Sequence, residues 1–358
     1  MADYQVLVAD LLTGRVLGEM PATAASWSHV RNAPGRLDVT VSISQPPDVI
    51  AALGSIIPGS VARTCGAIVR DGTIVAGGVW WTWDADFSAG TLSLHGEGWH
   101  SYVRRRTLRK DLSFTDQDQT SVIAKALVDY TQTTGQTPVI DTSAVVASGQ
   151  LRDRTWRASE RNNVGQLLEN MASDENGFSF RYDTVRVGDA IQARFVTSPD
   201  SGRRTPLVFE EGKNITTLSA KGDGTAVVTH VDGVGAGEGD AGLRTTQANA
   251  SLIGVYPLLD DVESHTEVTV PATLASHARR RLARGKAPIV LPKIAVNPNA
   301  DPTLGSYVVN DVVLVRSGFG LVDIDDLYLI VQLDGTLDRS GGEKIELTYA
   351  VADAFTTI

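Results

Sequence analysis

The chain is poor in cysteine, in positive charge and in long apolar runs. Cys65 is the only cysteine among 358 residues, which excludes an internal disulfide and fits folding in a reducing cytoplasm. With 32 basic against 42 acidic residues, the formal charge of −10 argues against a nucleic-acid or anionic-membrane binder. We expect no membrane span, because no run approaches 18 apolar residues, and no signal peptide at the acidic start.

What is present indicates a globular, turn-rich protein. Apolar residues make up 42% of the chain, enough for a buried core, and the 34 glycines favour β structure with many turns over helical bundles. A chain of 358 residues is too long for one ordinary core, so we expect two or three domains.

The two ends of the chain show strand patterns. Thr13-Gly14 and Asp71-Gly72 each separate two apolar runs, which predicts two hairpins. Leu37, Val39 and Val41 alternate as one buried strand face. Further strands are predicted at 79–83, 91–95, 177–183, 190–197, 289–296, 307–315, 327–333 and 344–349.

Three helices are predicted, at 118–133, 159–176 and 271–284. In the second, apolar residues recur at the spacing of one helix face, namely Val164, Leu167, Leu168 and Met171. Ser159 is its expected N-cap and Gly177 its expected left-handed stop. The third begins at Pro271, where a missing N–H is tolerated, and ends in arginines. The chain therefore divides into a β-rich start, a mixed middle and a β-rich end.

Several residues are candidates for chemistry. His95, Glu97 and His100 could hold zinc, but their spacing matches no standard zinc motif. A glycosidase needs two carboxylates across a cleft, and the candidates (Asp84, Asp86, Asp323, Asp325 and Asp326) lie beside turn residues. Gly237–Gly242 matches the GxGxxG pattern of dinucleotide-binding loops, but no helix is predicted to follow it, so the phosphate-binding helix end is missing. Cys65 in a strand is expected to be a buried hydrophobe. We therefore predict no catalytic, cofactor or metal site.

Two other groups suggest interaction surfaces. Trp80, Trp81 and Trp83 could stack on a sugar, although alternation places Trp81 and Trp83 on one face and Trp80 on the other. A basic run after residue 100 could meet phosphate but more often marks a solvated or inter-subunit face, so we predict a subunit interface at Arg104, Arg105, Arg106 and Arg109.

Several loose motifs occur along the chain in a characteristic order. They are Ser26–Gly35 (SWSHVRNAPG), Ala76–Trp80 (AGGVW) with Gly98–Arg106 (GWHSYVRRR), Ser113–Asp118 (SFTDQD), and Leu304–Leu314 (LGSYVVNDVVL) with Leu327–Val331 and Ile345–Thr348. In the order of these motifs the chain resembles minor tail proteins of long-tailed phages that infect actinobacteria, within the wider family of baseplate hub or tail-tip proteins.

The resemblance implies an α+β, mainly β fold with two β-barrel-like hub domains around an α+β middle module. The expected domains are 1–100, 101–205 and 206–358, the last with a helix at about 270–284. It implies a non-enzymatic homotrimeric ring at the virion's tail tip, assembled in the host cytoplasm. Expected partners are the distal tail protein ring, the tape-measure protein and tip or fibre proteins. The alternatives are a tail-associated cell-wall hydrolase and a carbohydrate-binding module.

Overall fold

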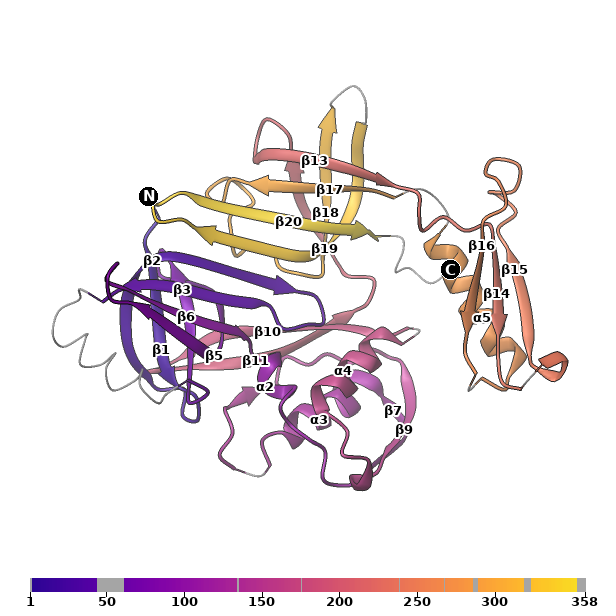
Figure 1. Cartoon of the computed structure of the whole chain (residues 1–358), viewed down its shortest axis with the longest axis horizontal. Coiled ribbons are helices and arrows are strands. Elements are labelled where there is room, and N and C mark those ends of the chain that lie inside the picture. Colours follow the sequence, from indigo (N-terminus) through magenta and orange to yellow (C-terminus); the bar gives the residue numbers. More distant parts are fainter. Residues whose placement is uncertain are drawn as a thin grey trace. The chain divides into compact units, whose positions relative to one another are not determined.

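The computed structural model describes residues 2–43, 61–133, 135–174, 176–237, 239–266, 268–285, 289–318 and 323–352. They form two compact units (Figure 1). One contains Met1–Leu218 with Lys293–Ala352, and the other contains Ser219–Pro292. The prediction of a mainly β chain with barrel-like parts is confirmed. The three-domain division at residues 100 and 205 stays a prediction.

Six strands of the first unit close into a barrel, here called the first barrel. They are β1 (Tyr4–Asp10), β2 (Val16–Val30), β3 (Arg36–Ser42), β4 (Thr64–Arg70), β5 (Thr73–Asp86) and β6 (Thr91–Gly98). The strand order is β1-β4-β5-β6-β3-β2, and pairing of β1 with β2 closes the ring. Both predicted hairpins are confirmed, because β1 pairs with β2 and β4 with β5 across the glycine turns.

A second strand set follows the middle of the chain. It consists of β12 (Arg203–Glu210), β13 (Ile215–Asp223), β17 (Ile289–Val296), β18 (Asp311–Gly318), β19 (Asp323–Leu337) and β20 (Glu343–Val351). β18, β19, β20, β17 and β13 are neighbours in that order, and β12 pairs with β18. The predicted strand at 307–315 begins later, at Asp311, because Asn310 has a left-handed φ of 78° that interrupts extended backbone.

The first barrel and the second strand set are one continuous sheet. The two longest of the strands described, β2 and β19, pair antiparallel along their second halves (Figure 1). In this register Trp27 stands opposite Gly335. One hydrophobic core runs through both sets and includes Trp27, Trp80, Tyr307 and Tyr349. Sequence patterns predicted the strands at each end of the chain, but not this pairing between the ends.

The middle of the chain packs a second core against the first barrel. Its elements are α2 (His100–Val103), β7 (Leu112–Asp118), the π-helical turn η1 (Gln119–Ala124), α3 (Lys125–Tyr130), β8 (Ile140–Asp141), β9 (Leu151–Trp156), η2 (Ala158–Glu160), α4 (Val164–Ser173), β10 (Phe178–Val187) and β11 (Ala190–Pro199). Strands β10, β11 and β8 form one sheet, and β7 pairs with β9. This core includes strand residues of the barrel such as Leu7 and Val79.

Two predicted helices differ from the observed ones at their ends. The helix expected from Ser159 begins at Val164, because Asn163 accepts the Gln166 N–H as N-cap and Ser159 lies in η2. It ends at Ser173 with Asp174 as C-cap, and the left-handed residue that follows is Asn176, with φ of 53°, instead of Gly177. The predicted apolar stripe is buried as expected. The helix expected at 118–133 is η1 followed by α3, and Asp118 caps it through the Thr120 and Ser121 N–H groups.

The second unit is a small α/β module. Strand β14 (His230–Val234) lies between β15 (Arg244–Ala248) and β16 (Asp260–Ser264), and a 3-10 turn, η3 (Gly239–Ala241), precedes β15. Helix α5 (Pro271–Arg284) begins at proline as predicted. Val228 and Val231 pack with Ala278 and Leu282 in its core. In the described part of the chain no helix is both long and apolar enough to cross a membrane.

Candidate interaction surfaces

The lone cysteine is a core residue. Cys65 lies on β4 with no exposed surface, as its strand pattern predicted. Burial raises the pKa of its thiol to about 12, and the nearby Asp10 carboxylate acts in the same direction. A thiol with this pKa is not a thiolate near neutral pH, so Cys65 is not an activated nucleophile.

The fold separates His100 from the other two candidate zinc ligands, because His95 and Glu97 both lie on the outward side of β6. His95 lies on the outward side of β6, where its ring meets Asp38 and Asp84. His100 is buried at the start of α2, and its Nε2 lies 2.7 Å from Glu169 Oε1. Burial lowers the pKa of His100, although Glu169 acts in the opposite direction. Among the described residues, no cluster of His, Cys, Asp or Glu side chains could hold a metal ion.

Each candidate hydrolase carboxylate whose side chain is described has its own local partner. Asp84 contacts His95, whereas Asp86 accepts the N–H groups of Ser88 and Ala89 in its own turn. Asp325 pairs with Arg316 at 2.9 Å on the neighbouring strand. Asp326 accepts the N–H of Leu327, and the side chain of Asp323 lies outside the described residues. These contacts are those of turn caps and strand ion pairs.

The tryptophans do not form one platform: Trp80 and Trp81 lie on opposite faces as predicted, but the predicted face of Trp83 is wrong. A β-bulge at Trp81 shifts the register between β5 and β6, so that Trp80 opposes Gly96 and Trp83 opposes Leu94. By this register Trp80 and Trp83 lie on the same side of the sheet, but Trp80 is buried in the core whereas Trp83 is 37% exposed. Trp81 points the other way and donates its indole N–H to Ser101 at 2.9 Å. A bulge cannot be read from simple alternation.

The basic run is partly used within the chain. Arg104 donates to both oxygens of Glu169, at 2.6 and 2.9 Å, and the guanidinium of Arg105 lies 4.0 Å above the Trp81 ring. These contacts hold α2 against α4 and β5. Arg105 and Arg109 are exposed, whereas Arg106 is half-buried. The predicted interface role of Arg104, Arg105, Arg106 and Arg109 stays a prediction, with Arg105 and Arg109 best placed for it.

A junction missed in the sequence joins three parts of the first unit. Arg31, the residue after β2, donates to Asn310 Oδ1 at 2.9 Å and to the carbonyl of Asp200 at 2.7 Å, and pairs with the Asp200 carboxylate. Asn32, with a left-handed φ of 57°, accepts the Phe180 N–H at 2.7 Å. An Asn before Ala-Pro-Gly was the available signal, because asparagine tolerates this conformation.

A second polar cluster joins the first barrel to the second strand set. Arg70 on β4 donates to both carboxylate oxygens of Glu343 on β20, at 2.5 and 3.0 Å, and to Asn299 at 2.7 Å. Tyr4 on β1 donates to the same carboxylate. Arg70 and Glu343 are both largely buried, so each charge needs the opposite charge beside it to offset its lost hydration.

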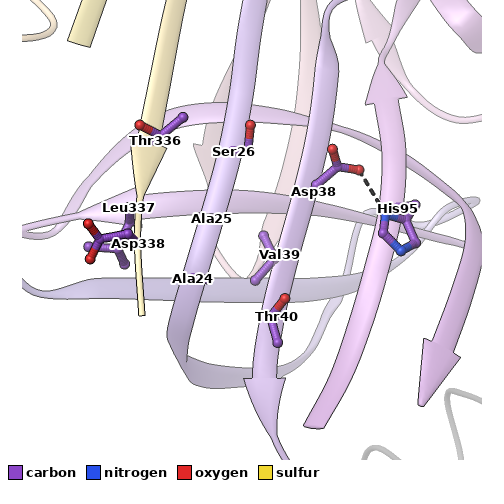
Figure 2. Close-up of a pocket in the computed structure, with 10 residues that line it drawn as sticks. All are labelled: Ala24, Ala25, Ser26, Asp38, Val39, Thr40, His95, Thr336, Leu337 and Asp338. Carbon is purple, nitrogen blue, oxygen red and sulfur yellow. Dashed lines mark hydrogen bonds and ion pairs between the residues drawn. The ribbon is translucent and has the colours of Figure 1, made fainter. Parts of the chain in front are cut away.

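The outward side of the continuous sheet forms one surface, here called the outer sheet face. It consists of outward-pointing residues of β5, β6, β3, β2, β19, β20 and β17. A pocket of about 280 Å³ lies on it where β2, β3, β6 and β19 meet (Figure 2). Small side chains, Ala24 and Ser26, line its base, and Asp38, His95 and Asp338 stand around it.

Carboxylates outnumber cations on the outer sheet face. Every cation described on its strands lies close to a carboxylate: Arg36 is 3.2 Å from Asp38, and Lys293 and Lys344 lie 3.3 and 3.0 Å from Glu346. Further carboxylates on these strands are Asp84, Asp86, Glu97 and Asp334. Among the residues described, each cation on this face already lies beside a carboxylate, so the face is poorly suited to bind a polyanion.

No protein-family model and no curated protein sequence matches the chain. Its fold matches solved structures along nearly its whole length. The 43 kDa tail protein of prophage MuSo2 from Shewanella oneidensis has 11% identity and a TM-score of 0.66, covering 99% of this chain and 100% of that one. A tail protein from Neisseria meningitidis has 15% identity and a TM-score of 0.60, covering 97% and 96%.

A third match extends the fold beyond phages. An E. coli component of the type VI secretion system has 11% identity and a TM-score of 0.50, covering 97% of this chain and 74% of that one. It is described as similar to the T4 bacteriophage tail proteins gp27 and gp5. The fold is therefore that of phage tail and baseplate hub proteins.

Proposed function

We propose that this chain is a structural, non-enzymatic hub protein at the tip of a phage tail. The observation that carries the proposal is the pairing of β2 with β19, which fuses the first barrel and the second strand set into one sheet. The fold match to tail proteins over nearly the whole chain supports it. Cys65, His100, Asp84, Asp86, Asp325 and Asp326 are committed to packing, turns or ion pairs, which gives no support to the hydrolase alternative.

In this proposal three copies form a closed ring in the virion. Each copy contributes two similar strand sets, so three copies present six related docking positions to a six-fold tail tube. Closed rotational symmetry is the common result of head-to-tail contacts between identical chains. The ring would close the tube, hold the distal tail protein ring, tape-measure protein and tip or fibre proteins, and open for the genome. The host class we propose is an actinobacterium infected by a long-tailed phage.

We assign the outer sheet face to the wall of the channel. A channel for DNA must not bind phosphates along its length, since each free cation adds an attraction that resists sliding. On this face each described cation is neutralised by a carboxylate, and carboxylates are in excess. Continuity across β2 and β19 gives each copy one uninterrupted wall segment.

Disrupting the gene in the phage or prophage that encodes the chain tests the tail-tip role. We expect tails that are absent or open at the distal end in electron micrographs, with infectivity restored by supplying the chain in trans. A matched complementation with the Cys65→Ala variant, which keeps the core apolar, should also restore tails, because no step of the proposed role uses the thiol. Normal, infectious tails without the chain would contradict the proposal.

A further inference from the structure

His95 contacts two carboxylates through its two ring nitrogens. Its Nδ1 lies 3.0 Å from Asp38 Oδ1, and its Nε2 lies 2.6 Å from Asp84 Oδ1. Both separations are hydrogen-bond lengths. A neutral imidazole has one N–H, so its bare nitrogen would face the lone pairs of one carboxylate. The arrangement is satisfied only when both nitrogens carry protons, which makes the ring an imidazolium.

The contacts bridge three neighbouring strands. Asp38 on β3 stands directly opposite His95 on β6. On the other side His95 opposes Thr82 of β5, and Asp84 is the diagonal neighbour, opposite Ser93. The bulge at Trp81 sets this register and so places Asp84 outward on the side of His95. Figure 2 shows the contact between Asp38 and His95 beside the pocket.

Carboxylates outnumber cations around the ring, which favours its cationic form. Arg36 on β3 pairs with Asp38, Glu97 lies further along β6, and Asp338 stands across the pocket on the segment after β19. Burial lowers the pKa of His95, but hydrogen bonds to Asp84 and Asp38 and their charges outweigh it and raise the pKa above its ordinary value. Asp84 is mostly exposed, so solvent and salt weaken its share.

We propose that Asp38, His95 and Asp84 form a proton-controlled clip across β3, β6 and β5. With His95 charged, the clip ties both flanking strands to β6. Loss of the proton leaves one carboxylate without a donor and makes the outer sheet face more negative by one charge. The clip is a property of the folded chain, and only its effect on the channel wall rests on the proposed function.

The sign of the pH effect follows from the raised pKa. The stabilisation is fully present below the unfolded-state value of about 6.5 and is lost as pH rises through the folded-state pKa. Replacing His95 by glutamine, which cannot carry the charge, should remove this dependence.

Titration of ¹³C-labelled histidine in the full chain by NMR tests the clip, with His95→Gln identifying the signal. We expect the titration midpoint of His95 to lie above about 6.5 in the wild type. The midpoint should be lower in Asp84→Asn and in Asp38→Asn. A decrease of about one pH unit corresponds to a tenfold lower proton affinity of the ring. Asp86→Asn is the matched control, because Asp86 lies on the same strand face but caps its own turn. It should leave the midpoint unchanged.

A wild-type midpoint at or below about 6.5, or one that Asp84→Asn does not lower, would overturn the clip. The measurement reads one side chain and gives the same answer whether the protein is a monomer or a ring. Failure of the clip is thus distinguishable from failure of the proposed tail role.

Discussion

Single residues bring strands from opposite ends of the chain together. Trp27 of β2 and Gly335 of β19 stand opposite each other, and a Cβ added at Gly335 would lie 2.1 Å from the indole ring. Glycine is required here by the close approach of the ring. The neighbouring pair formed by Arg31 and Asn32 makes the junction to β10 and to the turn before β18.

Gly335→Ala should destabilise the first unit by roughly 1–3 kcal/mol, the usual cost of overpacking a core. Trp27 is fully buried, so its ring cannot move aside into solvent. Urea unfolding followed by tryptophan fluorescence measures the change. Gly224→Ala is the control, since no atom lies within 4 Å of the added Cβ. Equal stability of the two variants would contradict the close packing.

Leu168→Ala tests the stripe of α4. Leu168 is fully buried in the core of the middle module, so its truncation should cost about 2–5 kcal/mol. Gln166 is exposed on the same helix, and Gln166→Ala should change stability by less than about 0.5 kcal/mol. Thermal unfolding by circular dichroism compares the two. An unchanged melting temperature in Leu168→Ala would show that the stripe is not core.

Glu169 should contribute to the acid sensitivity of the fold. Its pKa is lowered to about 2; burial acts to raise it, but hydrogen bonds and charges from His100 and Arg104 prevail. A lowered carboxyl pKa stabilises the protein above the unfolded value of about 4.3, and this is lost as pH falls toward 2. Unfolding measured between pH 6 and 3 should therefore show a shallower pH dependence in Glu169→Gln. An identical slope would exclude this role.

At the scale of elements, the cluster of Arg70, Glu343 and Tyr4 fastens β4 and β1 to β20. Glu343→Gln leaves the buried Arg70 charge with only the half-exposed Asp71, 3.3 Å away, as a carboxylate partner, which should cost up to about 3–5 kcal/mol. The exposed pair of Arg316 and Asp325 is the comparison, and Asp325→Asn should cost no more than about 1 kcal/mol. Denaturant titrations of both variants measure the difference. A similar loss in the free energy of unfolding for both variants would show that the buried pair stabilises the fold no more than the exposed pair does.

Local patterns were enough to predict many elements but not their partners. Alternation and Asp-Gly located the hairpin of β4 and β5, and helical spacing located the buried face of α4. The bulge at Trp81 and the π-helical turn before α3 were not predictable, because each depends on tertiary contacts that override regular periodicity. The pairing of β2 with β19 was also missed, since no sequence signal links strands so far apart.

The candidate sites show the same limit. Sequence adjacency grouped His95 with His100, whereas the fold turns one outward and buries the other. It also grouped four arginines, of which Arg104 is committed to Glu169. The partners of His95 come from strands β3 and β5, and only the sheet register brings Asp38 and Asp84 to it.

At the scale of the whole molecule, charge on the outer sheet face should matter for genome passage. Reversing Asp334 and Glu346 to lysine would add cations to the proposed channel wall, so genome release from assembled virions should become slower and more dependent on salt. Release can be followed with a DNA-binding dye after receptor or heat triggering. Asp189→Lys, in the exposed turn between β10 and β11, is the control and should release normally. Normal release from the double variant would exclude this face from the channel.

Electron cryomicroscopy of the purified protein, alone and with the neighbouring distal tail protein, tests the central claim most directly. We predict a closed ring of three copies of 38.1 kDa with six similar barrel densities, with β2 and β19 facing the channel. A stable two-fold dimer, or a monomer that stays single with its neighbour and in the virion, would contradict the account.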